Sequence, residues 1–539
     1  MRSALALASC VFLIVVLSIA RRSSPTFPVS DEAVIELSTL NALQGHQLLG
    51  PYSRYGWHHP GPALYYLLAP FYGLSGERSV GLAAGALAIN LAALALIVWV
   101  LFNRGSPSLA VAFAAVAALY LGRLDGLLVS SWNAHVAVLP ALGIIVTSAA
   151  VAAGSIGMMP LCVFLASFAV QTHIAVFPLV AVAGLGVLVG LAQSRRPVGR
   201  VLNLAAWTAL VLWLFPIAEQ VAPTGGNITA MWQFATGRSA GAAPTIAFEA
   251  WADMMTAVFR PGLAVPPGLL LPHDGAGWVG VAAVIELCLL LGAAWWAHER
   301  GRRFHVWLAL ELFAVAVAAL GAVSRIPDGI HDHEVFWISA VGVLSVVAIV
   351  SVPLLHMWDT ALIGFSVVHS ADPSGPRPRG WKAPRDEHLK TASAGLRLAT
   401  AICVGFVAVL AVAGVREVKN VADRSRVMTP GDLRIDRATR AVEGEIARTG
   451  ARRPKLLIDQ PVWEAAAGVI LQLRRKGTLI AVQPELENMF SGTVAADGTE
   501  DLEITFCGGP CHDRVAARWD NTVVLLGDGL AIDAIALSP

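Results

Sequence analysis

The chain has 539 residues, of which 56% are hydrophobic and 14% are charged, and its formal net charge is +1. Ordinary soluble domains carry about 25% charged residues, so this composition excludes a typical water-soluble protein. The near-zero net charge excludes the basic footprint of a nucleic-acid-binding protein. The apolar residues fall in runs of roughly 17–23, the length with which a helix crosses hydrocarbon, and they predict an integral membrane protein.

Eleven apolar runs are predicted to be membrane-spanning helices. The first is interpreted as an uncleaved span rather than a signal peptide, because it continues past Cys10 and no small-residue cleavage site follows it. The predicted spans cover residues 3–20, 79–101, 109–127, 136–153, 157–172, 174–193, 201–218, 278–297, 304–324, 335–355 and 395–415.

Arginine and lysine are concentrated in alternate connections, which predicts the orientation of the chain. With the N-terminus in the cytoplasm, the cytoplasmic connections carry most of these residues, among them Arg104, Arg195, Arg300 and Arg303. We therefore expect a multi-pass protein of the plasma (inner) membrane. Its extracytoplasmic parts are loops 21–78, 219–277 and 325–334 and the tail after 415.

Asp31 and Glu32 follow the first span directly. One interpretation is local: Ser30 caps a helix whose first turn carries the acids, where they favour the helix dipole. The other is functional, because a carboxylate close to hydrocarbon is costly and tends to be paired or catalytic. The sequence leaves both interpretations open.

Polar and aromatic islands recur at the predicted outer ends of the spans. The bland interpretation is anchoring at the membrane interface, which tyrosine and tryptophan commonly provide. The functional interpretation is a shared outward-facing site, since all the histidines of these islands map to one side of the membrane. The islands contain Arg54, Tyr55, Trp57, His58 and His59, then Trp132, Asn133 and His135, then Gln171 and His173, then Arg325, His331 and His333.

The tail is predicted to be a small α/β domain with a parallel sheet. Residues 455–459, 478–482 and 522–526 read as strands, and 462–476 reads as a helix with one apolar face. Strand–helix–strand order is typical of such domains. Cys507 and Cys511 are expected to form a local disulfide if the tail is extracytoplasmic.

An Asp-Glu pair just after the first span, followed by the aromatic segment Tyr55-Gly56-Trp57-His58-His59-Pro60-Gly61-Pro62, resembles the GT-C membrane glycosyltransferases. These include protein O-mannosyltransferases, lipid A aminoarabinose transferases, and actinobacterial arabinosyl- and mannosyltransferases. Trp132-Asn133-x-His135 and Gln171-Thr172-His173 are similar to motifs of the bacterial branch. The resemblance covers residues 1–350. It implies a mainly α, polytopic helical bundle (1–415), here followed by the α/β domain (416–539).

The resemblance also implies a reaction. A polyprenyl-phosphate-linked sugar would be the donor and a cell-envelope glycan, lipid or protein the acceptor, with inverting displacement at the anomeric carbon. Asp31 would be the general base and Glu32 its support. The leaving phosphate and the substrates would be bound by residues of the islands: Arg54, Tyr55, Trp57, His58, His59, Asn133, His135, Gln171, His173, Arg325 and His331. Some members of the superfamily use a divalent metal such as Mg or Mn and others use none, and the sequence decides neither this nor the oligomeric state.

Two other functions remain open at this point. A transporter or flippase for lipid-linked sugars would need a polar path through the bilayer, and Glu286 and Glu311 are the clearest charges within the spans. A non-catalytic assembly protein would use the tail as a binding module.

Overall fold

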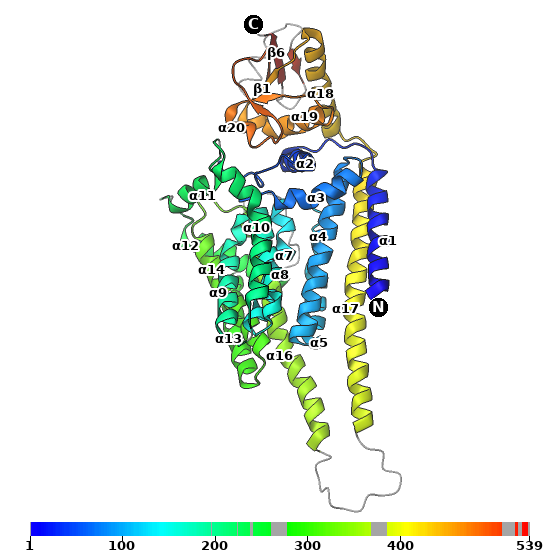
Figure 1. Ribbon diagram of the computed structural model, residues 1–539, viewed down its shortest axis with the longest axis vertical. Coiled ribbons are helices and arrows are strands. Elements are labelled where there is room, and N and C mark those ends of the chain that lie inside the picture. Colours follow the sequence, from blue (N-terminus) through cyan, green and yellow to red (C-terminus); the bar gives the residue numbers. More distant parts are fainter. Residues whose placement is uncertain are drawn as a thin grey trace, which may run out of the picture.

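In the computed structural model of the protein, a bundle of long helices carries an α/β unit at one end (Figure 1). The structure describes residues 2–508 apart from 125, 196, 224, 238–240, 260–276 and 368–384, together with 523–525 and 531–536. We call the end of the bundle that carries the α/β unit the outer end, and the opposite end the inner end.

Among the described residues, eight helical stretches are long and apolar enough to cross a membrane. They include α4 (Ser79–Val100), α7 (Val138–Ala152), α9 (Phe177–Ala192), α10 (Gly199–Val221), α13 (Gly277–Glu299), α14 (Arg303–Val323), α16 (Trp337–Val367) and α17 (Arg385–Arg424). The other three predicted spans are shorter apolar helices: α1 (Arg2–Arg21), α5 (Pro107–Leu121) and α8 (Met159–Thr172).

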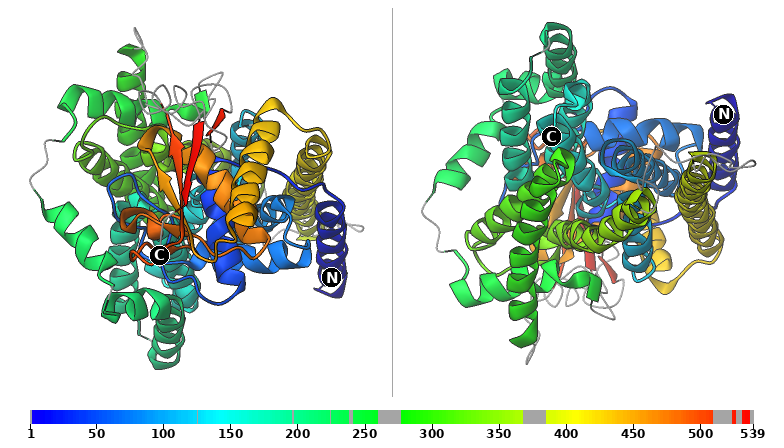
Figure 2. Two further views of the ribbon diagram at one scale, coloured as in Figure 1. Left: turned by 90° about the horizontal axis from the view of Figure 1, so that it is seen from above. Right: turned by 90° about the horizontal axis from the view of Figure 1, so that it is seen from below.

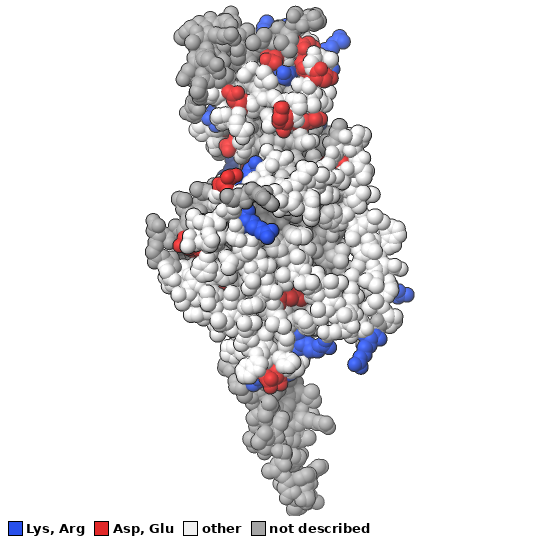
Figure 3. All heavy atoms as spheres, turned by 90° about the vertical axis from the view of Figure 1, so that its left-hand side faces the viewer, with Lys and Arg blue, Asp and Glu red and all other residues white. Residues whose placement is uncertain are grey.

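The charge distribution agrees with a bilayer-spanning bundle. In the face drawn in Figure 3, charged side chains gather on the α/β unit and near the inner end, and the belt between them is largely uncharged. Because lipid offers no hydrogen-bond partners, helices are the element expected in such a belt. The chain is a multi-pass membrane protein, mainly α-helical, as predicted.

Short helices cover the outer end of the bundle. They are α2 (Ser30–Leu43), α3 (Ala63–Leu74), α6 (Asn133–Val136), α11 (Asn227–Thr236), α12 (Pro244–Met255) and α15 (Asp332–Val335). The apolar segment predicted to lie on or dip into the bilayer corresponds to α3, which contains Pro70.

Helix α2 lies between the bundle and the α/β unit (Figure 1). Ala33, Val34 and Leu37 pack into the core of the α/β unit, whereas Ile35 and Leu40 pack with α3 and α4. Both sides of the helix are therefore buried, which explains why its sequence shows no clear amphipathic period. Helix α2 thus ties the two parts of the molecule together.

The α/β unit is built on a six-stranded sheet with the strand order β3-β2-β1-β4-β6-β5. Helices α18 (Pro430–Thr449) and α19 (Trp463–Arg475) pack against each other, α19 contacts α2, and α20 (Pro484–Glu487) is a single turn. Figure 2 shows the unit from above, over the helices of the bundle. The strands are β1 (Pro454–Ile458), β2 (Ala481–Val482), β3 (Val494–Ala495), β4 (Leu502–Cys507), β5 (Val523–Leu525) and β6 (Ala531–Ala536).

The prediction of a parallel sheet is correct for one half of the sheet only. Strand β1 pairs in parallel with β2 and β4, and β2 pairs in parallel with β3, but β6 is antiparallel to both β4 and β5. The predicted strand at 522–526 is β5, which lies at the antiparallel edge. Only five residues separate β5 from β6, too few for the crossover that a parallel pair requires, so the two strands pair antiparallel.

Two boundaries differ from the sequence prediction. Helix α17 continues to Arg424, beyond the predicted end of the last span at 415, and the α/β unit begins with α18. Charged residues follow the apolar run, and they are compatible with the backbone hydrogen bonds of a helix. The helix α17 therefore extends beyond the predicted span. Cys507 is disulfide-bonded, and Cys511 lies outside the described residues.

Candidate active site at the outer end of the bundle

Asp31 lies in the first turn of α2, directly after a strained residue. Ser30 has a φ of 53°, and Val29 occupies the N-cap position without a side-chain cap bond. The interpretation of Ser30 as the N-cap is therefore wrong. Left-handed backbone in a non-glycine residue costs about 1–3 kcal/mol and clusters at functional sites, so the geometry beside Asp31 favours a functional role.

The Asp31 carboxylate is solvent-exposed and has one hydrogen-bond partner among the residues that the structure describes. Trp132 Nε1 donates a hydrogen bond to its Oδ2 at 3.1 Å. Surrounding protein displaces bulk water and raises the pKa of Asp31, while His333 and the Trp132 hydrogen bond act in the opposite direction. A carboxylate that is held by one donor and has its second oxygen free is suited to accept a proton.

Aromatic and imidazole rings form a continuous row behind Asp31. The Trp132 ring lies 4.9 Å from that of His135 and 5.6 Å from that of His333. His333 lies 6.3 Å from His173, which in turn lies 4.7 Å from His59. We call Asp31, Trp132, His135, His333, His173 and His59 the outer cluster.

The outer cluster joins four regions of the chain. They are the first outer loop with α2 (Asp31 and His59), the segment that contains Trp132 and His135, the turn after α8 (His173) and α15 (His333). Of the histidines predicted to share a site, the structure brings His59, His135 and His173 together in this row. His331 adjoins the row, with its ring 5.5 Å from that of His333.

The deeper imidazoles are neutral hydrogen-bond donors. Burial, followed by the neighbouring His173, lowers the pKa of His59 well below its usual value, and burial lowers the pKa of His173 to about 3. His59 Nδ1 accepts a hydrogen bond from the Ile174 N–H at 3.1 Å, so its proton is on Nε2. A neutral imidazole N–H can donate to a phosphate oxygen without carrying a buried charge.

Arg54 connects the first outer loop to the loop before α16. Its guanidinium pairs with Glu334 Oε1 at 3.1 Å and donates to His331 Nε2 at 2.9 Å. It also donates to the Tyr55 hydroxyl and to the carbonyls of Pro327 and Gly329. Because Arg54 only donates, His331 Nε2 must accept, and the His331 proton is on Nδ1. The predicted phosphate ligand Arg54 is thus occupied within the protein.

An aromatic group flanks the row on the side of the second outer loop. The Tyr55 and Trp57 rings stack at 6.0 Å, and Phe234 of α11 lies 4.6 Å from Tyr55. The Trp57 ring also lies 5.8 Å from His59. Burial and the Glu334 carboxylate raise the pKa of Tyr55, so its hydroxyl stays protonated and donates to Glu334.

Three of the predicted binding residues hold the scaffold instead of facing the outer cluster. His58 is buried and bonds through Nδ1 to the Gly50 carbonyl. Its backbone N–H donates to Asn227 Oδ1, and its carbonyl accepts from Asn227 Nδ2. Asn133 donates to the Thr172 carbonyl and so joins α6 to the end of α8. Gln171 donates to the Leu212 carbonyl of α10.

The Pro-Gly-Pro segment also has a packing reason. A Cβ at Gly61 would lie 2.4 Å from Gln171 Oε1 and 2.5 Å from Pro216 Cγ. Only glycine allows the first outer loop to approach α8 and α10 this closely.

Glu32 and Arg325 are the predicted residues that no described side chain binds. Both are exposed. The surrounding protein, and then the neighbouring carboxylates of Glu36 and Asp31, raise the pKa of Glu32. The sequence analysis did not select Trp132, His333 or Glu334 as site residues. Each of them lies next to a predicted site residue in the same motif, so this adjacency in sequence could have identified them.

The arrangement assigns no metal ligands. Among the residues that the structure describes, no three His, Cys, Asp or Glu side chains are grouped as a metal site. The intramembrane acids are packed inside the bundle: Glu286 and Glu311 are buried, and Glu311 accepts a hydrogen bond from Ser148.

Comparison with known proteins gives structural neighbours only. No family model and no curated protein matches the sequence. The fold is similar to that of a crystal structure of ArnT from Cupriavidus metallidurans bound to undecaprenyl phosphate, with 13% identity, a TM-score of 0.48, and coverage of 99% of this chain and 98% of that one. It is equally similar to ArnT in the apo state, with 14% identity, a TM-score of 0.48, and coverage of 98% of each chain.

Proposed function

We propose that this protein is a membrane glycosyltransferase that moves a sugar from a polyprenyl-phosphate donor to a cell-envelope acceptor at the outer end of the bundle. The observation that carries the proposal is the Asp31 carboxylate held by Trp132 in front of a row of imidazole rings. The motif resemblance of the first outer loop supports the same reaction class. We place this end of the bundle on the extracytoplasmic side.

In the proposed reaction Asp31 is the general base. The acceptor hydroxyl oxygen forms a bond to the anomeric carbon while its proton passes to the free Asp31 oxygen. The bond from the anomeric carbon to the phosphate oxygen breaks, its electron pair leaves with the polyprenyl phosphate, and the configuration inverts. Proton transfer of this kind requires a base within about 3 Å of the hydroxyl.

The leaving phosphate is a stable anion and needs hydrogen-bond donors more than a proton. We assign the donors to the imidazoles of His59, His173 and His333, with His331 and Arg325 at the margin. Arg54 positions His331 through their 2.9 Å hydrogen bond. The stacked rings of Tyr55 and Trp57 offer a surface for the sugar.

The Asp31→Asn variant tests the base. Asparagine keeps the shape and can still meet the Trp132 N–H through its amide oxygen, but it cannot accept the proton. We expect transfer from a panel of polyprenyl-phosphate sugars to fall by about 100- to 10,000-fold, the range for a lost general base. The assay measures the release of polyprenyl phosphate by purified protein mixed with envelope acceptors.

Glu32→Gln is the matched control, because it removes a neighbouring carboxylate from the same turn and should retain most activity. Equal activity of wild type and Asp31→Asn would refute the base assignment. A wild type that moves labelled donor lipid between leaflets but releases no polyprenyl phosphate would identify the flippase alternative instead.

A further inference from the structure

A second polar site lies at the inner end of the bundle, away from the outer cluster. It is a cavity of about 1000 Å³, lined by the ends of several helices and the turns that join them. Its lining includes Arg104 from the turn after α4, Arg195 from the α9–α10 connection, and Arg303 from the start of α14. Three connections that are far apart in sequence thus contribute one arginine each.

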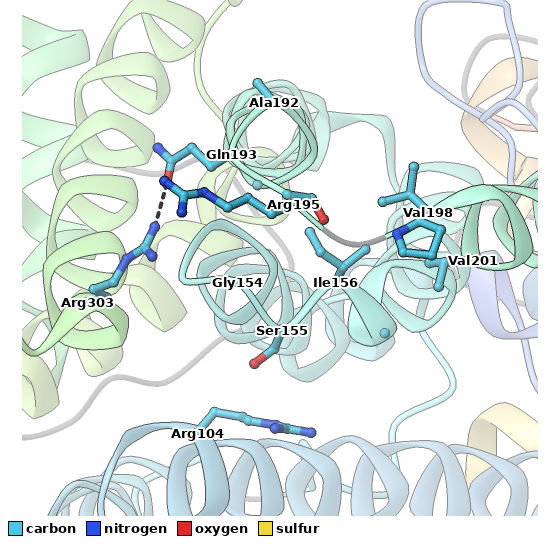
Figure 4. Close-up of a pocket in the computed structure, with 14 residues that line it drawn as sticks. Arg104, Gly154, Ser155, Ile156, Ala192, Gln193, Arg195, Val198, Val201 and Arg303 are labelled. Atoms are coloured by element: carbon cyan, nitrogen blue, oxygen red, sulfur yellow. Dashed lines mark hydrogen bonds between the residues drawn. The ribbon is translucent and has the colours of Figure 1, made fainter.

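The three arginines line a cavity whose described lining is free of acids. Figure 4 shows Arg195 pointing toward Gln193 and Arg303, with Arg104 across the cavity from Ser155. Arg303 donates a hydrogen bond to Gln193. None of the described residues that line the cavity is Asp or Glu. Like charges repel when they are brought together, so an anion would stabilise this arrangement.

The surfaces next to the cavity are suited to lipid chains. Ala192 of α9 and Val201 of α10 line the cavity. One turn deeper in the bundle, Leu188 is 61% exposed and Leu204 is 58% exposed, and Trp207 continues the apolar surface of α10. An anion bound by the arginines and an apolar tail that follows α9 and α10 could therefore belong to one molecule.

We propose that this inner cavity binds the phosphate headgroup of an acidic phospholipid in the adjacent leaflet. Arginine recognises phosphate through paired N–H donors, and basic pockets between membrane helices at the cytoplasmic side are suited to anionic headgroups. The positive-inside rule requires arginines on this side of the membrane but not in one place. That three of them line one cavity bordered by exposed apolar side chains is what favours a lipid site.

The test is lipid binding to the purified full-length protein in detergent, measured by native mass spectrometry. Dioleoyl phosphatidylglycerol is compared with dioleoyl phosphatidylcholine, which has the same chains and no net charge. The triple variant Arg104→Gln, Arg195→Gln, Arg303→Gln is expected to lose about 100-fold in phosphatidylglycerol affinity. The single variant Arg195→Gln is expected to lose about fivefold and serves if the triple variant does not fold.

The matched control removes three arginines outside the cavity lining: Arg200→Gln, Arg300→Gln and Arg397→Gln. It should bind phosphatidylglycerol like the wild type, since none of these three side chains lines the cavity. The proposal is overturned if wild type binds both lipids equally or if both triple variants lose the same affinity. Displacement of the lipid by millimolar inorganic phosphate would show a small-anion site and would also overturn it.

Discussion

At the scale of single residues, burial raises the pKa of Asp31, and the Trp132 indole is its one direct hydrogen-bond donor among the described residues. The indole N–H donates to the carboxylate and so lowers the Asp31 pKa, against the larger effect of burial. Trp132→Phe keeps a ring against His135 and His333 but removes the donor. The Asp31 pKa should rise by about one unit, since a hydrogen bond to a charged group is worth roughly 1.5–3 kcal/mol.

The pH–rate profile of transfer measures this change. The base works when it is ionised, so activity falls as the pH drops through the Asp31 pKa, and Trp132→Phe should move this acid limb to higher pH. Trp57→Phe is the control, because Trp57 Nε1 is buried and has no hydrogen-bond partner among the described residues. An unchanged acid limb in Trp132→Phe would contradict the role of the indole.

Asp31 also carries a stability prediction of unusual sign. Its pKa in the folded protein is raised above the usual value, so its contribution to stability is present at low pH and is lost as the pH rises through the folded pKa. At neutral pH the ionised carboxylate therefore costs stability. Asp31→Asn should unfold at the same temperature as wild type or at a higher one, while transfer is lost.

Thermal unfolding of both proteins in detergent checks this, and the difference should vanish toward acidic pH, where Asp31 is protonated in wild type as well. A clear drop in the unfolding temperature of Asp31→Asn at pH 7 would mean that the carboxylate is structural.

The sequence identified the candidate site in outline and misassigned part of it. Asp31, His59, His135 and His173 could be found because acids and histidines at the ends of apolar spans are expensive and stand out. The scaffold roles of His58, Asn133 and Gln171 could not, because which side of a loop a side chain faces depends on packing between distant segments. The role of Arg54 could not be predicted for the same reason, since its ion-pair partner Glu334 lies 280 residues away in sequence.

At the scale of elements, α2 is fixed to α19 by a buried ion pair. Glu36 is fully buried and accepts from the Arg475 guanidinium and from the Tyr72 hydroxyl at 2.8 Å. Arg475 also donates to the Thr26 carbonyl and to the Ser79 hydroxyl, each at 2.8 Å. One arginine of the α/β unit thus holds the helix that carries Asp31.

Arg475→Met should be strongly destabilising. It leaves the Glu36 carboxylate buried without its partner, which costs about 3–5 kcal/mol. Thermal unfolding followed by tryptophan fluorescence measures the loss. Lys476→Met is the matched control, since its pair with Glu443 is exposed and such pairs contribute only about 0–1 kcal/mol.

The double variant Glu36→Met, Arg475→Met separates the ion pair from the packing. It removes the unpaired charge, so it should recover part of the stability that Arg475→Met loses. A double variant that is less stable than Arg475→Met would show that the unpaired Glu36 carboxylate is not the cause of the lost stability.

At the scale of the whole molecule, the bundle was predictable and its union with the α/β unit was not. Membrane-spanning helices are readable because each must be a long apolar run. Helix α2 contains no such run, and its apolar residues face two different cores. Strands β3, β4 and β6 were likewise missed, because strands acquire their identity from pairing partners elsewhere in the chain.

The position of α2 makes the orientation of the molecule testable with a single pair of variants. Because α2 packs against both α19 and α3, the outer cluster and the α/β unit must lie on the same side of the membrane. Arg453 reports that side, with 43% of its side chain exposed, and exposed Arg200 reports the inner end. We expect a membrane-impermeant thiol reagent to label Arg453→Cys in intact cells and not Arg200→Cys.

The background for this experiment is the chain in which the four cysteines that are free among the described residues, Cys10, Cys162, Cys288 and Cys403, are replaced. A permeant thiol reagent must label both variants, which shows that each engineered cysteine is reactive. Labelling of Arg200→Cys alone by the impermeant reagent would place Asp31 in the cytoplasm. An outward-facing donor sugar could not then reach the base, and the proposed transfer at the extracytoplasmic surface would have to be abandoned together with the predicted orientation.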